Sequence, residues 1–179
     1  MKFIYLTGGP CTAKTSIVEN IENTMGEYVE YSPIKLFKGK LYKKTNTFVM
    51  HLDSTSYGVI SKFKEFVNLM HNKGISVLAE GDRFTTQKYI EWLLDTYPNT
   101  SKVFILTVND EVAKLRHKKR GDKQNEKWIA GRVSLINNLL NNLFLRNQLT
   151  IRDTSDTIDE IQKEIMEIIK CEHPDKTKY

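Results

Sequence analysis

The sequence is poor in the residues that build disulfide-linked, metal-bound or disordered proteins. Among 179 residues it has two cysteines, Cys11 and Cys171, and four histidines that show no metal-ligand spacing. This composition argues against a disulfide framework or a zinc site, and a reducing cytoplasm is the expected compartment. Nine glycines and four prolines are too few to predict a long disordered stretch.

Long apolar segments are missing as well. No run is long enough to span a bilayer, and the chain begins with an apolar strand pattern rather than a signal-peptide layout, so we expect no membrane partner. The length suits one domain, which we expect to cover residues 1–171, with a tail at 172–179. A net charge of +5 and a pI of about 9.1 fit an anionic ligand such as ATP or DNA.

What the sequence does contain is a regular alternation of strand and helix patterns. Strands are predicted at Lys2–Thr7, Tyr28–Tyr31, Thr47–Leu52, Ile75–Ala79, Val103–Val108 and Leu149–Ile151. Helices are predicted at Lys14–Met25, Ser56–Asn72, Thr86–Tyr97, Asp110–Arg120, Asn125–Leu143 and Ser155–Lys170. We predict the basic stretch 35–44 (KLFKGKLYKK) to be a loop or an excursion over the substrate. The alternation indicates an α/β fold, a parallel sheet with helices on both faces, in which ligands bind beyond the carboxyl ends of the strands.

The first strand pattern ends in a glycine-rich turn that opens a helix. This turn matches the phosphate-binding pattern G-x-x-x-x-G-K-[ST] at Gly8, Lys14 and Thr15, and departs from it at Ala13. In such a turn backbone N–H groups hold phosphate oxygens, the lysine reaches the β- and γ-phosphates, and the hydroxyl binds Mg²⁺. We expect Ala13 to take helical φ/ψ angles, which tolerate its methyl group. The predicted ATP-binding set is Gly8, Gly9, Pro10, Cys11, Thr12, Ala13, Lys14, Thr15 and Ser16. The alternative is a glycine-rich turn with a chance lysine.

Acidic residues follow two further strand patterns. The first group is Glu80-Gly81-Asp82-Arg83, where a carboxylate would hold Mg²⁺ or take a proton from the acceptor, and Arg83 would clamp a phosphate. We predict that Asp82 and Thr15 bind the metal, against the alternative of a surface turn with a local Asp–Arg pair. Asp53 is a second candidate for the general base, and a helix cap is an equally good interpretation.

Two loops near the expected ATP site carry further candidates. The densest basic run, 116–124 (RHKKRGDKQ), is followed by Gly131-Arg132. We predict a basic lid at about 116–132 whose arginines, Arg116, Arg120 and Arg132, neutralise the transferring phosphoryl group, although a solvated helix face is the alternative. Asp153 precedes the last helix, and its loop would pack against adenine or cap that helix.

The combination of motifs resembles the nucleotide-kinase branch of P-loop proteins. The turn DRFTTQKYI, from Asp82 to Ile90, resembles the Asp-Arg-aromatic turn of thymidylate kinases, which contacts the nucleotide monophosphate and its metal. The set GGPCTAKT, EGDR and RGDKQNEKWIAGR is similar to bacteriophage P-loop kinases that act on 5-hydroxymethyluracil in DNA during thymine hypermodification. This resemblance spans residues 1–155.

The resemblance implies an ATP- and Mg²⁺-dependent kinase that phosphorylates the 5-hydroxymethyl group of this base in phage DNA, in the host cytoplasm. Reaching that group would require the base to be flipped out of the duplex. Two other functions stay open. One is a free nucleotide kinase of the thymidylate or deoxynucleoside monophosphate type, and the other is a non-catalytic ATP-binding module that regulates a partner.

Overall fold

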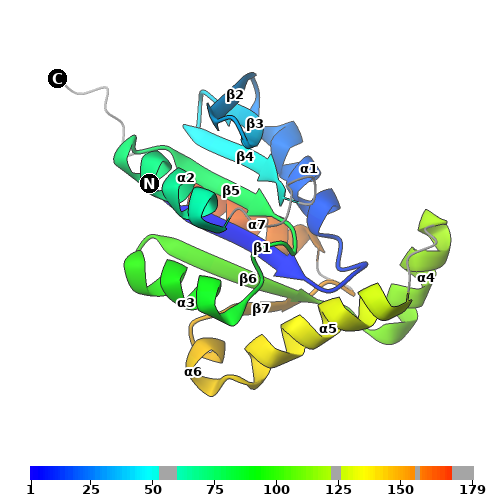
Figure 1. The fold of residues 1–179 in the computed structure, drawn as a ribbon. Helices are drawn as coiled ribbons and strands as arrows, with labels where there is room; N and C mark the ends of the chain where they lie inside the picture. The colour runs from blue at the N-terminus through cyan, green and yellow to red at the C-terminus, as the bar shows by residue number, and fades with distance from the viewer. Residues whose placement is uncertain (53–59, 122–125, 156–157, 171–179) are drawn as a thin grey trace.

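The computed structural model describes residues 1–52, 60–121, 126–155 and 158–170, together forming a layered α/β structure (Figure 1). Asp53, residues 122–125 of the predicted lid and the predicted tail 172–179 lie outside the described residues. Within the described ranges, no helix is long and apolar enough to cross a membrane.

The central layer is a seven-stranded sheet with the order β2-β3-β4-β5-β1-β6-β7. Five strands are parallel: β1 (Phe3–Gly8), β4 (Thr47–His51), β5 (Ser76–Glu80), β6 (Ser101–Thr107) and β7 (Thr150–Asp153). Two antiparallel strands extend the sheet at one edge: β2 (Tyr28–Ile34) and β3 (Phe37–Tyr42). Every residue of β1 and β5 is buried, because helices cover both faces of the sheet.

Helices cover both faces of the sheet (Figure 1). The first face carries α1 (Lys14–Met25) and α7 (Ile158–Lys170), whose isoleucines pack together on the sheet. The opposite face carries α2 (Ile60–Asn72), α3 (Gln87–Thr96), α5 (Glu126–Asn141) and the short α6 (Leu143–Arg146). The remaining helix, α4 (Asp110–Arg120), has no buried residue and projects beyond the carboxyl edge of the sheet.

An aromatic cluster fixes the second face. Phe63 and Phe66 lie on the buried side of α2, and the ring of Phe63 stacks on Phe84 with centroids 4.2 Å apart. Phe84 belongs to the turn that follows β5, so this stack ties the turn to the core. Stacked aromatic pairs add stability beyond their buried area.

The prediction of a loop at 35–44 is wrong, because most of this segment is β3. Alternation explains the strand: Phe37 and Leu41 pack against the core of one face, whereas Lys40 and Tyr42 point to the other. Gly39 pairs closely with β4, where an added Cβ would lie 2.2 Å from the carbonyl oxygen of Val49. The high lysine content masked this period-two pattern in the sequence.

Candidate active site

The carboxyl ends of the parallel strands bring the predicted motifs to one edge of the sheet. Leu6 of β1 and His51 of β4 are both register partners of Glu80 on β5, and Thr107 of β6 is the partner of Asp153 on β7. This is the edge at which open α/β sheets bind ligands. Of the described motif residues, Gly8, Glu80 and Asp153 lie at this edge, at the ends of β1, β5 and β7.

The loop between β1 and α1 is closed by its own hydrogen bonds. Thr12 Oγ1 donates to the carbonyl oxygen of Gly9 over 2.9 Å. Lys14 Nζ donates to the carbonyl oxygens of Gly9 and Gly8 over 3.0 and 3.2 Å, so the ammonium lies over the loop. Gly8 is required here, because an added Cβ would lie 2.3 Å from the carbonyl oxygen of Leu106. A phosphate in this loop would offer Lys14 a charged acceptor, which binds an ammonium more strongly than carbonyls do.

The prediction of helical angles at Ala13 is wrong. Ala13 has φ 60° and ψ 18°, in the left-handed region, and its carbonyl oxygen accepts from Ile17 N over 3.0 Å. The chain therefore turns into the helix at this residue rather than after it. A left-handed conformation costs a residue with a Cβ about 1–2 kcal/mol, which explains why glycine is usual at this position of the motif. Cys11 also has a positive φ, of 62°.

A buried carboxylate meets the hydroxyl of Thr15. Thr15 Oγ1 donates to Glu80 Oε1 over 3.1 Å, and Glu80 is 1% exposed. Its second oxygen, Oε2, is buried and has no hydrogen-bond partner among the described residues. An unpaired carboxylate oxygen beside a threonine hydroxyl fits Mg²⁺, which takes oxygen ligands and is usually bound by one or two carboxylates plus substrate phosphates.

The structure places the predicted metal ligand Asp82 elsewhere. Asp82 Oδ2 lies 3.0 Å from Arg132 Nε, and both side chains are nearly buried. Thr15 is thus brought together with Glu80, and the metal role of Asp82 stays a prediction. The described residues contain no cluster of three metal-binding side chains, so an ion at Thr15 and Glu80 would need phosphate oxygens or water to complete its shell.

His51 was not recognised from the sequence as part of this site. Its Nδ1 lies 2.7 Å from Glu80 Oε1, and its Nε2 lies 3.6 Å from Glu22 Oε2. The neighbouring carboxylates of Glu22 and then Glu80 raise the pKa of His51 to about 10, which favours the charged ring. In the sequence, His51 can be noticed only as a polar residue at the end of a predicted strand. Its contact with Glu80 depends on β4 lying beside β5, which the sequence does not show.

The turn after β5 is held by a buried tyrosine that was also missed. Tyr5 Oη donates to the carbonyl oxygen of Gly81 over 3.0 Å and accepts from Phe84 N over 3.3 Å. These bonds hold the backbone around Asp82 and Arg83, and neither side chain is fully exposed. The predicted phosphate contact of Arg83 stays a prediction.

The three predicted lid arginines occupy different environments. Arg116 Nη1 donates to the carbonyl oxygen of Cys11 over 3.0 Å, and Nη2 donates to the carbonyl oxygen of Thr154 over 2.6 Å. Arg116 therefore links the phosphate loop to the connection between β7 and α7. Arg120 is exposed at the end of α4, and Arg132 is paired with Asp82. Their catalytic roles stay predictions.

Asp153 lies on the far side of the loop from Glu80. The carboxylate is exposed, and its Oδ1 accepts from Ser155 N over 2.7 Å. Hydrogen bonds from Ser155 lower the pKa of Asp153. Asp153 thus stabilises the turn after β7, and its contact with adenine stays a prediction.

Solved structures share this architecture over nearly the whole chain. A gluconokinase from Sinorhizobium meliloti aligns over 94% of this chain and 91% of its own, with a TM-score of 0.55 and 13% identity. The YorR protein from Bacillus subtilis, solved in complex with phosphorylated GDP, aligns over 96% and 98%, with a TM-score of 0.57 and 21% identity. The fold is that of P-loop kinases. No protein-family model and no curated protein matches the sequence.

A third solved structure shows how little of the sequence this fold requires. An uncharacterized protein from Eubacterium ventriosum aligns over 94% of this chain and 98% of its own, with a TM-score of 0.55 at 7% identity. The predicted fold class is therefore confirmed. Identities this low show the P-loop kinase fold alone, and the chemistry must be argued from the residues of this chain.

Proposed function

We propose that this protein is a Mg²⁺-dependent phosphotransferase that uses ATP. The observation that carries the proposal is the closed loop with Lys14 over it, beside the pair formed by Thr15 and Glu80. The first N–H groups of α1 and the ammonium of Lys14 would hold the β- and γ-phosphates. Thr15 and Glu80 would hold Mg²⁺, which when bound neutralises charge on the phosphate oxygens.

The finer proposal is that the acceptor is the 5-hydroxymethyl group of 5-hydroxymethyluracil in DNA. Its hydroxyl oxygen would form a bond to the γ-phosphorus as the bond from that phosphorus to the bridging oxygen of ADP breaks. The hydroxyl proton needs a base. Among the described carboxylates at this sheet edge, Glu80 is bonded to Thr15 and Asp153 is exposed, which leaves Asp82 as the candidate. Asp82 would release Arg132, which could then contact the transferring phosphoryl group.

The shape of α4 supports a DNA acceptor. This helix buries none of its residues, and it projects from the sheet edge that holds the phosphate loop (Figure 1). Its exposed cations are Lys114, Lys118, Lys119 and Arg120. A row of exposed cations beside the site suits a phosphodiester backbone, and the resemblance to phage DNA-base kinases points to the same acceptor.

A free nucleotide is the second candidate acceptor. The YorR protein was solved in complex with phosphorylated GDP, and it shares the fold over nearly the whole chain. A nucleotide kinase would need no exposed cations on α4, which is why we place it second.

The test is a phosphate-transfer assay with ATP labelled in the γ-phosphate. The acceptors are duplex DNA with 5-hydroxymethyluracil, the same duplex with thymine, thymidylate and other free deoxynucleotides. We expect label on the modified duplex alone, loss of transfer with EDTA, and loss with Asp82→Asn while ATP binding persists. Because each neutralised phosphate releases counterions, transfer should fall steeply with salt.

The outcomes separate the proposals. Label on thymidylate but not on modified DNA at low salt would replace the DNA acceptor with a nucleotide. ATP binding without transfer to any acceptor would favour a regulatory ATP-binding module. Failure to bind ATP with Mg²⁺ would overturn the phosphotransferase proposal itself.

A further inference from the structure

A line of alternating charges runs from the phosphate loop along the sheet to the far half of α1. It consists of Glu80, His51, Glu22 and Lys40, with Thr15 at its start. We infer that His51 and Glu22 are positioning residues that hold the carboxylate of Glu80 with Oε2 facing the metal site. This inference rests on the proposed function, because it assigns the metal to Thr15 and Glu80.

The geometry of Glu80 carries the first step. Both described donors, Thr15 Oγ1 and His51 Nδ1, bond to the same oxygen, Oε1, over 3.1 and 2.7 Å. Oε2 is therefore left without a hydrogen-bond partner, although it is buried. A carboxylate with one oxygen held by two donors has a fixed plane, and its second oxygen is the one that can ligate a cation.

The geometry of His51 carries the second step. Its ring bridges two carboxylates, with Nδ1 on Glu80 and Nε2 3.6 Å from Glu22 Oε2. A histidine with both nitrogens engaged cannot rotate its ring without losing both contacts. Second partners of this kind fix ligand orientation in metal sites, and their loss typically weakens metal binding about 10–100-fold.

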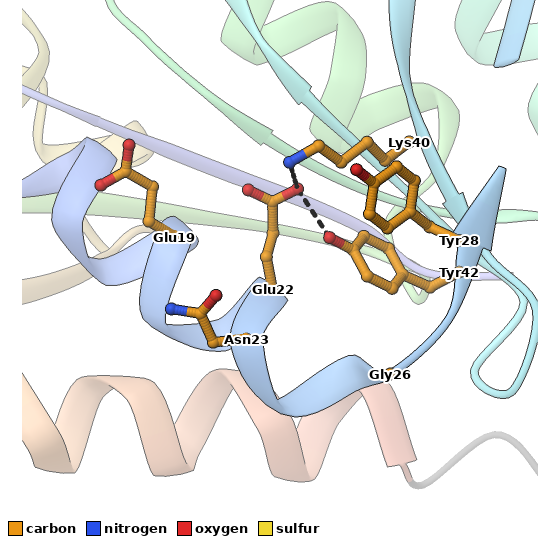
Figure 2. A pocket seen from close by; sticks show the side chains of 7 residues that line it. All are labelled: Glu19, Glu22, Asn23, Gly26, Tyr28, Lys40 and Tyr42. Atoms are coloured by element: carbon orange, nitrogen blue, oxygen red, sulfur yellow. Dashed lines mark hydrogen bonds and ion pairs between the residues drawn. The ribbon is translucent and has the colours of Figure 1, made fainter. Parts of the chain in front are cut away.

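The far end of the line is also held in place. Tyr42 Oη donates to Glu22 Oε1 over 2.9 Å, and Lys40 Nζ lies 3.1 Å from the same oxygen (Figure 2). Glu22 is 7% exposed, although an open hollow lined by Glu19, Asn23 and Tyr28 lies beside it. Oε2 of Glu22 thus faces His51, while Oε1 is held by Tyr42 and Lys40 of β3. The antiparallel strand β3 therefore supports the metal site through Glu22 and His51.

Two substitutions at one position separate this role from simple packing. His51→Asn places an amide N–H near the position of Nδ1 and keeps a donor for Glu80. His51→Gln extends its amide toward the position of Nε2 and keeps a donor for Glu22 instead. Both remove the ring from a residue that is 38% exposed, so a purely structural role would affect the two variants alike.

The measurement is Mn²⁺ binding in the presence of ADP, followed by electron paramagnetic resonance of free Mn²⁺. We expect His51→Gln and His51→Ala to weaken binding about 10-fold or more, and His51→Asn to stay within about threefold of the wild type. The half-saturating Mg²⁺ concentration for transfer should rise in the same order, with kcat at saturating Mg²⁺ recovering in His51→Gln. Glu22→Gln, which leaves His51 intact, should weaken Mn²⁺ binding about threefold.

The result that overturns the inference is wild-type Mn²⁺ binding in folded His51→Gln and His51→Ala. Equal weakening in His51→Asn and His51→Gln would also overturn it, because the bond to Glu80 would then not be the cause. If His51→Gln fails to fold, unchanged binding in Glu22→Gln and His51→Ala is the contradicting outcome. Absence of Mn²⁺ and ADP binding in the wild type would instead contradict the proposed function.

Discussion

The phosphate loop and α4 are neighbours at the same edge of the sheet but are built in opposite ways. The loop follows β1, whose residues are all buried, and hydrogen bonds from Lys14, Thr12 and Arg116 fix its backbone. Helix α4 has no buried residue and ends in a turn of four basic residues. The comparison indicates that the ATP end of the proposed reaction relies on fixed geometry, whereas the acceptor end relies on exposed charge.

The largest effect is expected from the loop itself. Lys14→Ala should lower phosphate transfer on the order of 10³-fold, because the ammonium stabilises charge that develops on the phosphates. The melting temperature without ATP should change little, since Lys14 is half-buried and its hydrogen bonds with Gly8, Gly9 and Thr12 lie within one loop at the rim of the fold. Transfer kinetics and thermal denaturation are the measurements.

A matched control for Lys14→Ala is Lys118→Ala on α4, which removes an exposed cation near the same edge. Lys118→Ala should leave ATP binding unchanged. Near-normal turnover of Lys14→Ala would refute the assignment of the loop.

Two arginines of α4 test the comparison directly. Arg116→Ala should lower the melting temperature and raise KM for ATP about 10-fold, because the side chain joins Cys11 to Thr154. Arg120→Ala should leave both unchanged, since Arg120 is exposed, but should raise KM for DNA and flatten its salt dependence. Steady-state kinetics at several salt concentrations check both.

Arg116→Lys is the control that keeps the charge but loses the fork that contacts two carbonyl groups. It should behave like Arg116→Ala in the melting experiment. If Arg120→Ala lowers kcat at saturating DNA instead, Arg120 acts on the phosphoryl group, and α4 belongs to the chemical site.

The sequence was sufficient for the parallel core of the fold. The β1 pattern, the loop motif and the helix that follows are local features, and α1 and α4 have the predicted bounds. Strand β3 was missed because its two lysines and the lysines on either side hide its alternation, and the short helix α6 was missed because only one of its residues is buried. Local patterns do not report which strand pairs with which, so the antiparallel hairpin became visible only in the structure.

The site was only partly predictable for the same reason. Lys14 and Thr15 follow from a motif, whereas the link between Thr15 and Glu80 depends on β5 lying beside β1. His51 and Glu22 come from segments whose contact requires the sheet order as well. The angles of Ala13 were predicted wrongly because the motif indicates a helix start but does not say at which residue the chain turns.

A smaller effect is expected at Ala13. Ala13→Gly should relieve about 1–2 kcal/mol of backbone strain and lose about 0.4–1 kcal/mol through the greater freedom of glycine in the unfolded chain. The variant should therefore be up to about 1.6 kcal/mol more stable and should keep its activity. Chemical denaturation and the transfer assay measure these two quantities.

Gly9→Ala offers the contrast to Ala13→Gly, because Gly9 does not have a positive φ and an added Cβ there meets no atom within 4 Å. It should change stability little. A destabilised or inactive Ala13→Gly variant would contradict the left-handed assignment.

The smallest effect is a pH dependence at Glu22. Burial alone would raise its pKa, but the interactions with His51, Tyr42 and Lys40 outweigh burial and lower the pKa below the ordinary 4.5. A lowered pKa means that the carboxylate stabilises the fold above the ordinary value, and that this contribution is lost as pH falls through the folded pKa. Glu22→Gln should therefore cost about 1–3 kcal/mol near neutral pH and progressively less below pH 4.5.

Glu19→Gln is the control for Glu22→Gln, since Glu19 is an exposed glutamate one turn earlier on the same helix. Denaturation of both variants between acid and neutral pH checks the prediction. If the loss in free energy of unfolding caused by Glu22→Gln does not change with pH, the charge of Glu22 does not stabilise its contacts with His51 and Lys40.

The most direct test of the account is calorimetric titration of a non-hydrolysable ATP analogue with and without Mg²⁺. The wild type, Lys14→Ala, Glu80→Gln and Arg120→Ala variants are compared under the same conditions. We predict Mg²⁺-dependent binding in the wild type and in Arg120→Ala, loss of binding in Lys14→Ala, and loss of the Mg²⁺ dependence in Glu80→Gln. Equal binding in all four proteins, or no binding in the wild type, would contradict the claim that this sheet edge is a Mg²⁺–ATP site.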